Sequence, residues 1–197
     1  DVYAPSVSRF TTMASGDIAI PKGLRTEGGI RFQTNASGDI ECSTVQCGSF
    51  EAETNASGDV EVQEVNCRKL QTRINASGDM KIKKAVCRDA ALAVNASGDL
   101  IFSSLQCQET LEGTVNGSGD MLVSGHCLKA VLRDNASGDL DAGSLKAEEV
   151  DAAVHGSGDL SCRVSKKLTA KSYGSGNLVY AGNPSQVTKE GKHIYSK

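Results

Sequence analysis

Carboxylate, amide and hydroxyl side chains recur together along this chain in the pentapeptide NASGD. The motif begins at Asn35, Asn55, Asn75, Asn95 and Asn135, with NGSGD at Asn116 and HGSGD at His155. Oxygen ligands of these kinds suit Ca²⁺, and GSGDL resembles half of the Ca²⁺-binding nonapeptide repeat. That repeat returns every nine residues, whereas NASGD occurs once in about 20. We therefore predict no cofactor and keep bound Ca²⁺ as the alternative.

The chain also carries seven cysteines and three histidines. No cysteines form a CxxC pair, and the histidines lie at unrelated positions of the repeat, so neither a zinc cluster nor a histidine-based catalytic site is indicated. Cysteines one repeat apart would point the same way, which is poor disulfide geometry. We predict reduced, buried thiols that pack as small apolar groups, with a soft-metal ladder as the alternative. This thiol ladder comprises Cys47, Cys67, Cys87, Cys107 and Cys127.

The spacing of the motif indicates the architecture that must position these groups. Its last residue falls at Asp17, Asp39, Asp59, Asp79, Asp99, Asp120, Asp139, Asp159 and Asn177. The interval is 20 residues with slips of one or two, and a fixed period of this size is typical of a solenoid. We place one extra residue before Asp120, in LEGTVNGSGD, and one missing residue before Cys127, so that corners absorb both slips.

Apolar and polar residues alternate after every motif, which is the pattern of a strand with one buried face. Ile40 and Cys42 flank Glu41, for example. A second apolar segment ends at each cysteine of the ladder, and a third begins three residues later, as in FEAET. Three short strands in 20 residues, repeated in the next copy, predict an all-β, single-stranded parallel β-helix (β-solenoid) of about eight to nine coils.

The repeat covers nearly the whole chain, so we predict one β-helix domain over residues 1–197. A stack of coils must end without an open edge that recruits another molecule. Pro21 and the sequence TEGG continue a ladder poorly, which favours an N-terminal capping region over 1–30. Pro184 and a cluster of tyrosines favour a C-terminal capping region over 181–197. Regular coils are expected over 31–180.

The motif itself is compatible with two conformations. If the alternation continues through it, Ala36 and Gly38 point inward; if Gly38 adopts a positive φ, the motif is a corner whose Asn or Asp bonds turn amides. Ser-Gly-Asp is turn chemistry, which favours the corner. Carboxylates stacked about 4.8 Å apart repel by ~1 kcal/mol in water, so amide hydrogen bonds or cations must offset the repulsion. The candidate polar ladder comprises Asn35, Ser37, Asp39, Asn55, Ser57, Asp59, Asn75, Ser77, Asp79, Asn95, Ser97 and Asp99.

Composition narrows the partners. The 21 basic and 24 acidic residues give a net charge of -3, and there are four Phe, four Tyr and no Trp, so nucleic acid is not expected as a partner. No apolar run approaches the ~20 residues that span a bilayer. The opening DVYAPSVSRF lacks the features of a signal peptide, which we expect to be already removed if the protein is exported. The ligand, the oligomeric state and the handedness of the coil stay open.

Three stretches carry a family resemblance: the serial GSGD and ASGD coils, the leading SRFTTMASGDIAIPKG and the closing GSGNLVYAGNPSQVTKEG. They resemble the head GIN domain family, labelled as autotransporter adhesins, of exported proteins from Bacteroidetes-type bacteria. The resemblance covers essentially the whole chain. It implies a β-helical envelope protein, in the periplasm, on the outer membrane surface or outside the cell, without established catalytic residues.

Three classes of function follow. The first is a non-catalytic surface module that presents repeated polar groups to a glycan or a cell-surface protein. The alternative is a polysaccharide-processing β-helix enzyme, which would need two or three carboxylates or basic residues converging in a groove. A structural envelope spacer is the third class, and it would have no face more regular than its neighbours.

Overall fold

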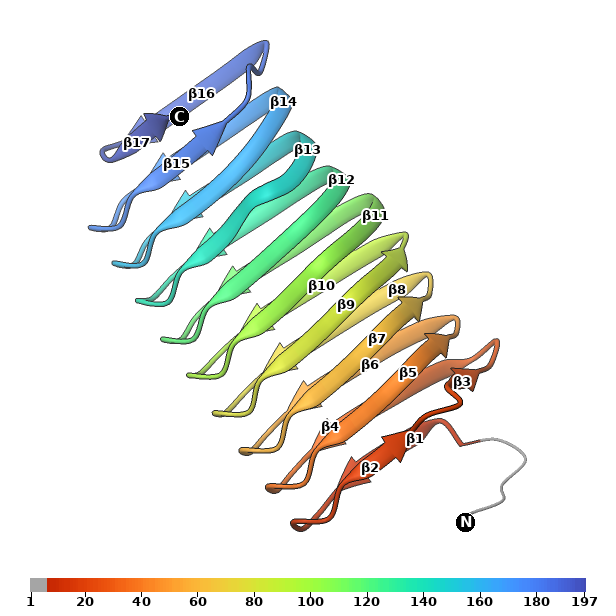
Figure 1. Ribbon diagram of the computed structural model, residues 1–197. Coiled ribbons are helices and arrows are strands. Elements are labelled where there is room, and N and C mark those ends of the chain that lie inside the picture. Colours follow the sequence, from red (N-terminus) through yellow and green to blue (C-terminus); the bar gives the residue numbers. More distant parts are fainter. Residues whose placement is uncertain (1–6) are drawn as a thin grey trace.

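The computed structural model describes residues 7–197, which form a solenoid of parallel strands without a helix (Figure 1). All strand pairs are parallel, and each joins a segment to its equivalent one coil away. The molecule is a straight stack of about nine turns. The predicted fold class is therefore confirmed. No helix in the described part is long and apolar enough to cross a membrane.

Residues 7–197 form seventeen strands, which make up the stack. The first coil holds β1 (Arg9–Thr12), β2 (Ile18–Ile20) and β3 (Leu24–Arg25). The next coils are built from β4 (Gly29–Thr34), β5 (Ile40–Gln46), β6 (Ser49–Thr54), β7 (Val60–Asn66), β8 (Lys69–Ile74), β9 (Met80–Cys87) and β10 (Asp89–Val94). Long strands follow as β11 (Leu100–Val115), β12 (Met121–Asp134), β13 (Leu140–Val154) and β14 (Leu160–Ser172). The last are β15 (Leu178–Ala181), β16 (Gln186–Gly191) and β17 (Ile194–Ser196).

The number of strands per coil differs from the three that we predicted. In β5, β7 and β9 the first two apolar segments are continuous, and from β11 to β14 all three form one bent strand. Only the turn at the motif interrupts every coil. The ladder hydrogen bonds of a parallel stack run between coils, so a strand can bend at a corner without losing its partners.

Equivalent side chains stack in register and form the core. The residue that follows each motif from Asp39 onward is at most 1 % exposed, whereas Ile18 in the first coil is half-buried. This column contains Ile40, Val60, Met80, Leu100, Met121, Leu140, Leu160 and Leu178. Near the first coil, the rings of Phe10, Phe32 and Phe50 stack edge to face, with centroids 5.5 and 5.1 Å apart. Each such ring contact adds about 0.5–1.5 kcal/mol beyond the burial of apolar area.

Bulges absorb the slips in the repeat. The extra residue that we placed just before Asp120 lies earlier, because Val94 and Val115 stay in register while β11 bulges between Cys107 and Thr110. The missing residue lies before Cys127 as predicted, at the register shift that ends at Gly125. The extra residue at the bulge places Gln108 on the surface.

The terminal segments continue the ladder. Strand β16 pairs with β14 and β17 pairs with β15, so part of the predicted 181–197 cap forms the last coil. At the other end, β1 pairs with β4 and β2 with β5. Residues 1–6 of the predicted N-terminal cap lie outside the described residues. The capping role of both segments stays a prediction.

Candidate functional site

The NASGD motif forms the corner that joins β4 to β5, and likewise in the following coils. Asn35 and Ser37 are exposed and Gly38 is buried. Our expectation of a positive φ at Gly38 is wrong: the described glycines with positive φ are Gly23, Gly125, Gly182 and Gly191. Glycine is needed at position 38 because a Cβ there would clash with the carbonyl oxygen of Gly16 in the preceding coil. The motif therefore sets how closely the corners stack.

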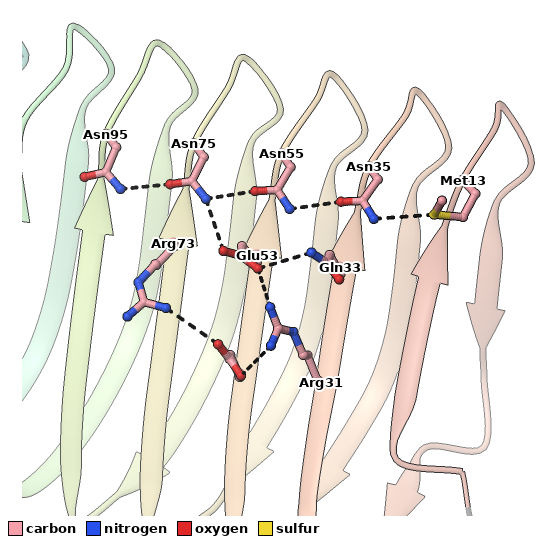
Figure 2. Close-up of polar contacts among 10 residues, drawn as sticks. Met13, Arg31, Gln33, Asn35, Glu53, Asn55, Arg73, Asn75 and Asn95 are labelled. Carbon is pink, nitrogen blue, oxygen red and sulfur yellow. Dashed lines mark hydrogen bonds and ion pairs between the residues drawn. The ribbon is translucent and has the colours of Figure 1, made fainter.

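The asparagines of the motif form a continuous ladder of side-chain amides (Figure 2). Each Nδ2 donates to the Oδ1 of the preceding coil, at 2.9 Å from Asn55 to Asn35 and at 2.8 Å from Asn75 to Asn55 and from Asn95 to Asn75. Asn116 and Asn135 extend the ladder at 2.9 and 2.8 Å. Most of the amide groups are therefore engaged by their own neighbours along the stack.

The aspartates form a second ladder through the main chain. The backbone N–H of Asp59 donates to Oδ1 of Asp39 at 2.8 Å, Asp79 donates to Asp59 at 2.7 Å, and Asp99 donates to Asp79 at 2.8 Å. The same bond recurs up to Asn177, whose N–H and Nδ2 both donate to Asp159. A backbone donor for every carboxylate is one of the two means of offsetting the repulsion that we predicted. Among residues 7–197, no three His, Cys, Asp or Glu side chains are placed to hold a metal ion.

The serines of the motif complete the outer edge of the corner. Ser37, Ser57, Ser77 and Ser97 are exposed. Within residues 7–197 their hydroxyls donate no hydrogen bond to protein. Beneath them lies a column that sequence reasoning missed: the buried Thr34 hydroxyl donates to the carbonyl of Gly58 at 2.9 Å. A threonine directly before the asparagine was the available signal.

A network of charged side chains adjoins the amide ladder (Figure 2). Glu53 accepts hydrogen bonds from Arg31 at 2.6 Å, from Gln33 at 3.3 Å and from the Asn75 amide at 3.2 Å. Arg31 also pairs with Glu51 at 3.4 Å. Apart from Asn75, these residues occupy outward positions whose residue type changes from coil to coil, so periodicity gave no indication of the network.

All seven cysteines are free and buried. Burial raises the pKa of Cys42 to about 11 and the pKa values of Cys127 and Cys162 to about 12. Thiols of the ladder contact one another in pairs. The contact with Cys47 raises the pKa of Cys67 and lowers that of Cys47, and Cys87 and Cys107 form the second such pair.

We expect thiol reagents to label the native protein slowly and to find seven thiols after denaturation, because the thiolate is the reactive form and burial opposes it. Labelling should begin at Cys47, which is 9 % exposed and has a lowered pKa. Mass spectrometry of timed labelling checks both points, with Cys47→Ser as the control. Two or more disulfides in the intact mass would contradict the prediction.

Two of the hollows on the surface bear on function. The first, called the basic groove here, has a volume of about 480 Å³ and contains three arginines and three amides above the edge of the thiol ladder. Those six side chains are Arg25, Gln46, Asn66, Arg68, Arg88 and Gln108.

The second hollow, called the C-terminal recess, has a volume of about 800 Å³. Asp139, Asp141 and Asp159 line it together with Ser161 and other residues. Oδ1 of Asp141 accepts hydrogen bonds from the Ser161 hydroxyl at 2.5 Å and from the Gly143 N–H at 2.9 Å. The recess lies where β14 lacks residues that β13 has, at the register shift between Ala142 and Lys146. Neither hollow could be located from the repeat, because both depend on residues or slips that break it.

Comparison with known families agrees with the resemblance carried by the motifs. A family model described as "Putative auto-transporter adhesin, head GIN domain" matches residues 1–126 and 87–184. No curated protein sequence matches the chain. Since the two matched segments together cover most of the chain, the protein belongs to the head GIN domain family.

Proposed function

We propose that the protein is an exported, non-catalytic adhesin module that binds glycan chains at the cell surface. One observation carries the proposal: outward side chains repeat in register from coil to coil, as the Asn ladder and the exposed serines do. A polymer with repeating units can contact several such positions at once, and linked weak contacts add to a much higher avidity. The family description supports a location on the cell surface.

The C-terminal recess favours a second candidate, a polysaccharide-processing enzyme. Asp139, Asp141 and Asp159 line one hollow, and glycoside hydrolysis uses pairs of carboxylates. Oδ1 of all three already accepts a backbone hydrogen bond, however. A carboxylate held in this way suits the binding of sugar hydroxyls better than proton transfer, which supports binding over catalysis.

A glycan array probed with the full chain tests the proposal. We expect retention of at least one class of polysaccharide, with affinity that falls when the polymer is shortened. The same polymers are then incubated with the protein and assayed for new reducing ends. Release of reducing ends that is lost in Asp141→Asn would favour the enzyme. Failure to retain any polymer, with no product formed, would contradict both functions and favour a spacer.

A further inference from the structure

The basic groove concentrates positive charge that the rest of the protein does not neutralise. Arg88 pairs with Glu109 at 3.0 Å and approaches Asp89 at 3.9 Å. Arg25 and Arg68 form no ion pair with any of residues 7–197, and both are exposed at the groove. On a chain of net charge -3, two unpaired guanidinium groups in one hollow are a local exception.

The cationic surface extends beyond the groove. An adjoining hollow of about 430 Å³ shares Arg68 and Arg88 with it and adds Lys69. The acidic side chains that line the two hollows are Glu27 and Asp89, so cations outnumber anions four to two. An anionic ligand that spans both hollows would meet Arg68 and Arg88, which lie on adjacent coils about 4.8 Å apart along the stack.

Departures from the 20-residue period bound the groove at both ends. The first coil is two residues longer than the period, and its segment Arg25–Glu27 lines one end. At the other end, the bulge of β11 between Cys107 and Thr110 projects Gln108 into the lining. A regular stack would have an even corner here, so the two insertions give the hollow its walls.

The chemistry of the lining specifies the ligand. A guanidinium group donates a planar fork of hydrogen bonds that fits carboxylate and sulfate-like oxygens. The amides of Gln46, Asn66 and Gln108 can donate to and accept from hydroxyl groups. A volume of about 480 Å³ lies within the range of ligand sites, about 300–1,000 Å³. Anionic groups and hydroxyls occur together on acidic polysaccharides.

We propose that the basic groove binds the anionic groups of an acidic polysaccharide through Arg25, Arg68 and Arg88. This inference rests on the proposed glycan-binding function and assigns that function a ligand class and a site. It places the ligand on the corner opposite the NASGD motif, over the edge of the thiol ladder.

Titration calorimetry of the full chain with polygalacturonate, dextran sulfate and neutral dextran tests the inference. We expect an acidic polymer to bind, with an affinity that falls as salt rises, and neutral dextran not to bind. The carboxylated and sulfated polymers show which anionic group is preferred. The double variant Arg25→Gln/Arg68→Gln should bind at least about tenfold more weakly, since hydrogen bonds to charged groups are the strong ones. Its melting temperature should match the wild type, because both side chains are exposed and unpaired.

The matched control is Lys146→Gln/Lys167→Gln, which removes two exposed cations of β13 and β14 and so changes the net charge equally. Its affinity should be unchanged. A second readout is protection: bound polygalacturonate should slow the labelling of Cys47, which lines the groove.

Equal weakening in the two double variants would show non-specific attraction and overturn the inference. Full binding by Arg25→Gln/Arg68→Gln, or no binding of either acidic polymer by the wild type, would also overturn it. If the glycan array retains only neutral polymers, the proposed function stands and the groove assignment falls. An array that retains nothing contradicts both.

Discussion

Replacing Gly78 with alanine should lower the free energy of unfolding by about 3 kcal/mol or more, the upper range for overpacking. A Cβ at this position would clash with the carbonyl oxygen of Gly58 and lie 3.0 Å from that of Ala56. Both obstacles are backbone atoms, which cannot rotate away as a side chain can. Relief therefore requires the coils to separate at the corner, which breaks the Asn and Asp ladders there. Urea denaturation followed by circular dichroism measures the effect.

Gly16 offers a matched control in the same motif and column. It belongs to the first coil, and a Cβ added to it meets nothing within 4 Å in the described part of the chain. Gly16→Ala should be neutral or stabilise by up to about 1 kcal/mol, because alanine has less freedom to lose from the unfolded chain. Equal destabilisation by both variants would show that the motif needs glycine for its backbone conformation and not for the close approach of coils.

The contrast between these glycines shows what the repeat could and could not reveal. Periodicity and alternation identify the stack and its buried columns, because every coil repeats the same burial. The column that contains Ile18 and Ile40 was assigned from its position after the motif alone. The reason for Gly38 was not accessible in this way, since turn chemistry and close packing both select Ser-Gly-Asp. The difference lies in the distance between coils, and a sequence does not contain it.

The candidate sites also differ in whether the period of the repeat reveals them. The asparagines and aspartates could be assigned to ladders because stacking follows from the period. The basic groove depends on Arg25, Arg68 and Gln108. Arg68 and Gln108 each follow a cysteine of the thiol ladder, so the period aligns them, whereas Arg25 belongs to the longer first coil and has no arginine at the equivalent positions of the next coils. The hollow takes its shape from the insertions at its two ends. When a repeat is aligned, such insertions are removed as irregularities. In the folded protein they shape the surface.

Asp134 breaks the repeat in the core, and replacing it with threonine should stabilise the protein at pH 7 by about 1–3 kcal/mol, the cost of a buried unsatisfied polar group. The residue is fully buried between Val115 and Val154. Oδ1 accepts from the Ala136 N–H at 3.1 Å, whereas Oδ2 has no partner among the described residues. It occupies the position from which the Thr34 hydroxyl reaches the carbonyl of the glycine 24 residues later.

The pH dependence follows from the environment of this carboxyl group. Burial raises the pKa of Asp134, the nearby Asp139 and Asp159 raise it further, and His155 together with the Ala136 N–H lowers it. Because the pKa is raised in the folded state, the contribution of Asp134 to stability is most favourable below the unfolded pKa of about 3.9. This contribution is lost as pH rises through the folded pKa. Oδ2 lies 2.9 Å from the place where a Cβ of Gly158 would stand, and protonation of the carboxyl group removes the charge whose burial is unfavourable.

The difference in unfolding free energy between Asp134→Thr and the wild type should therefore be smallest near pH 4. It should grow with pH until Asp134 is fully ionised in the wild type. Asp134→Asn keeps the shape of the side chain without its charge, so it should show the same growth with pH. Glu149→Gln removes an exposed carboxylate from the neighbouring coil and should follow the wild type at every pH. Unfolding free energies of the wild type and the three variants, measured from pH 4 upward, test this prediction. If Asp134→Asn is less stable than the wild type above neutral pH, the ionised carboxylate has a stabilising partner, and Asp134 is a structural anion of the stack.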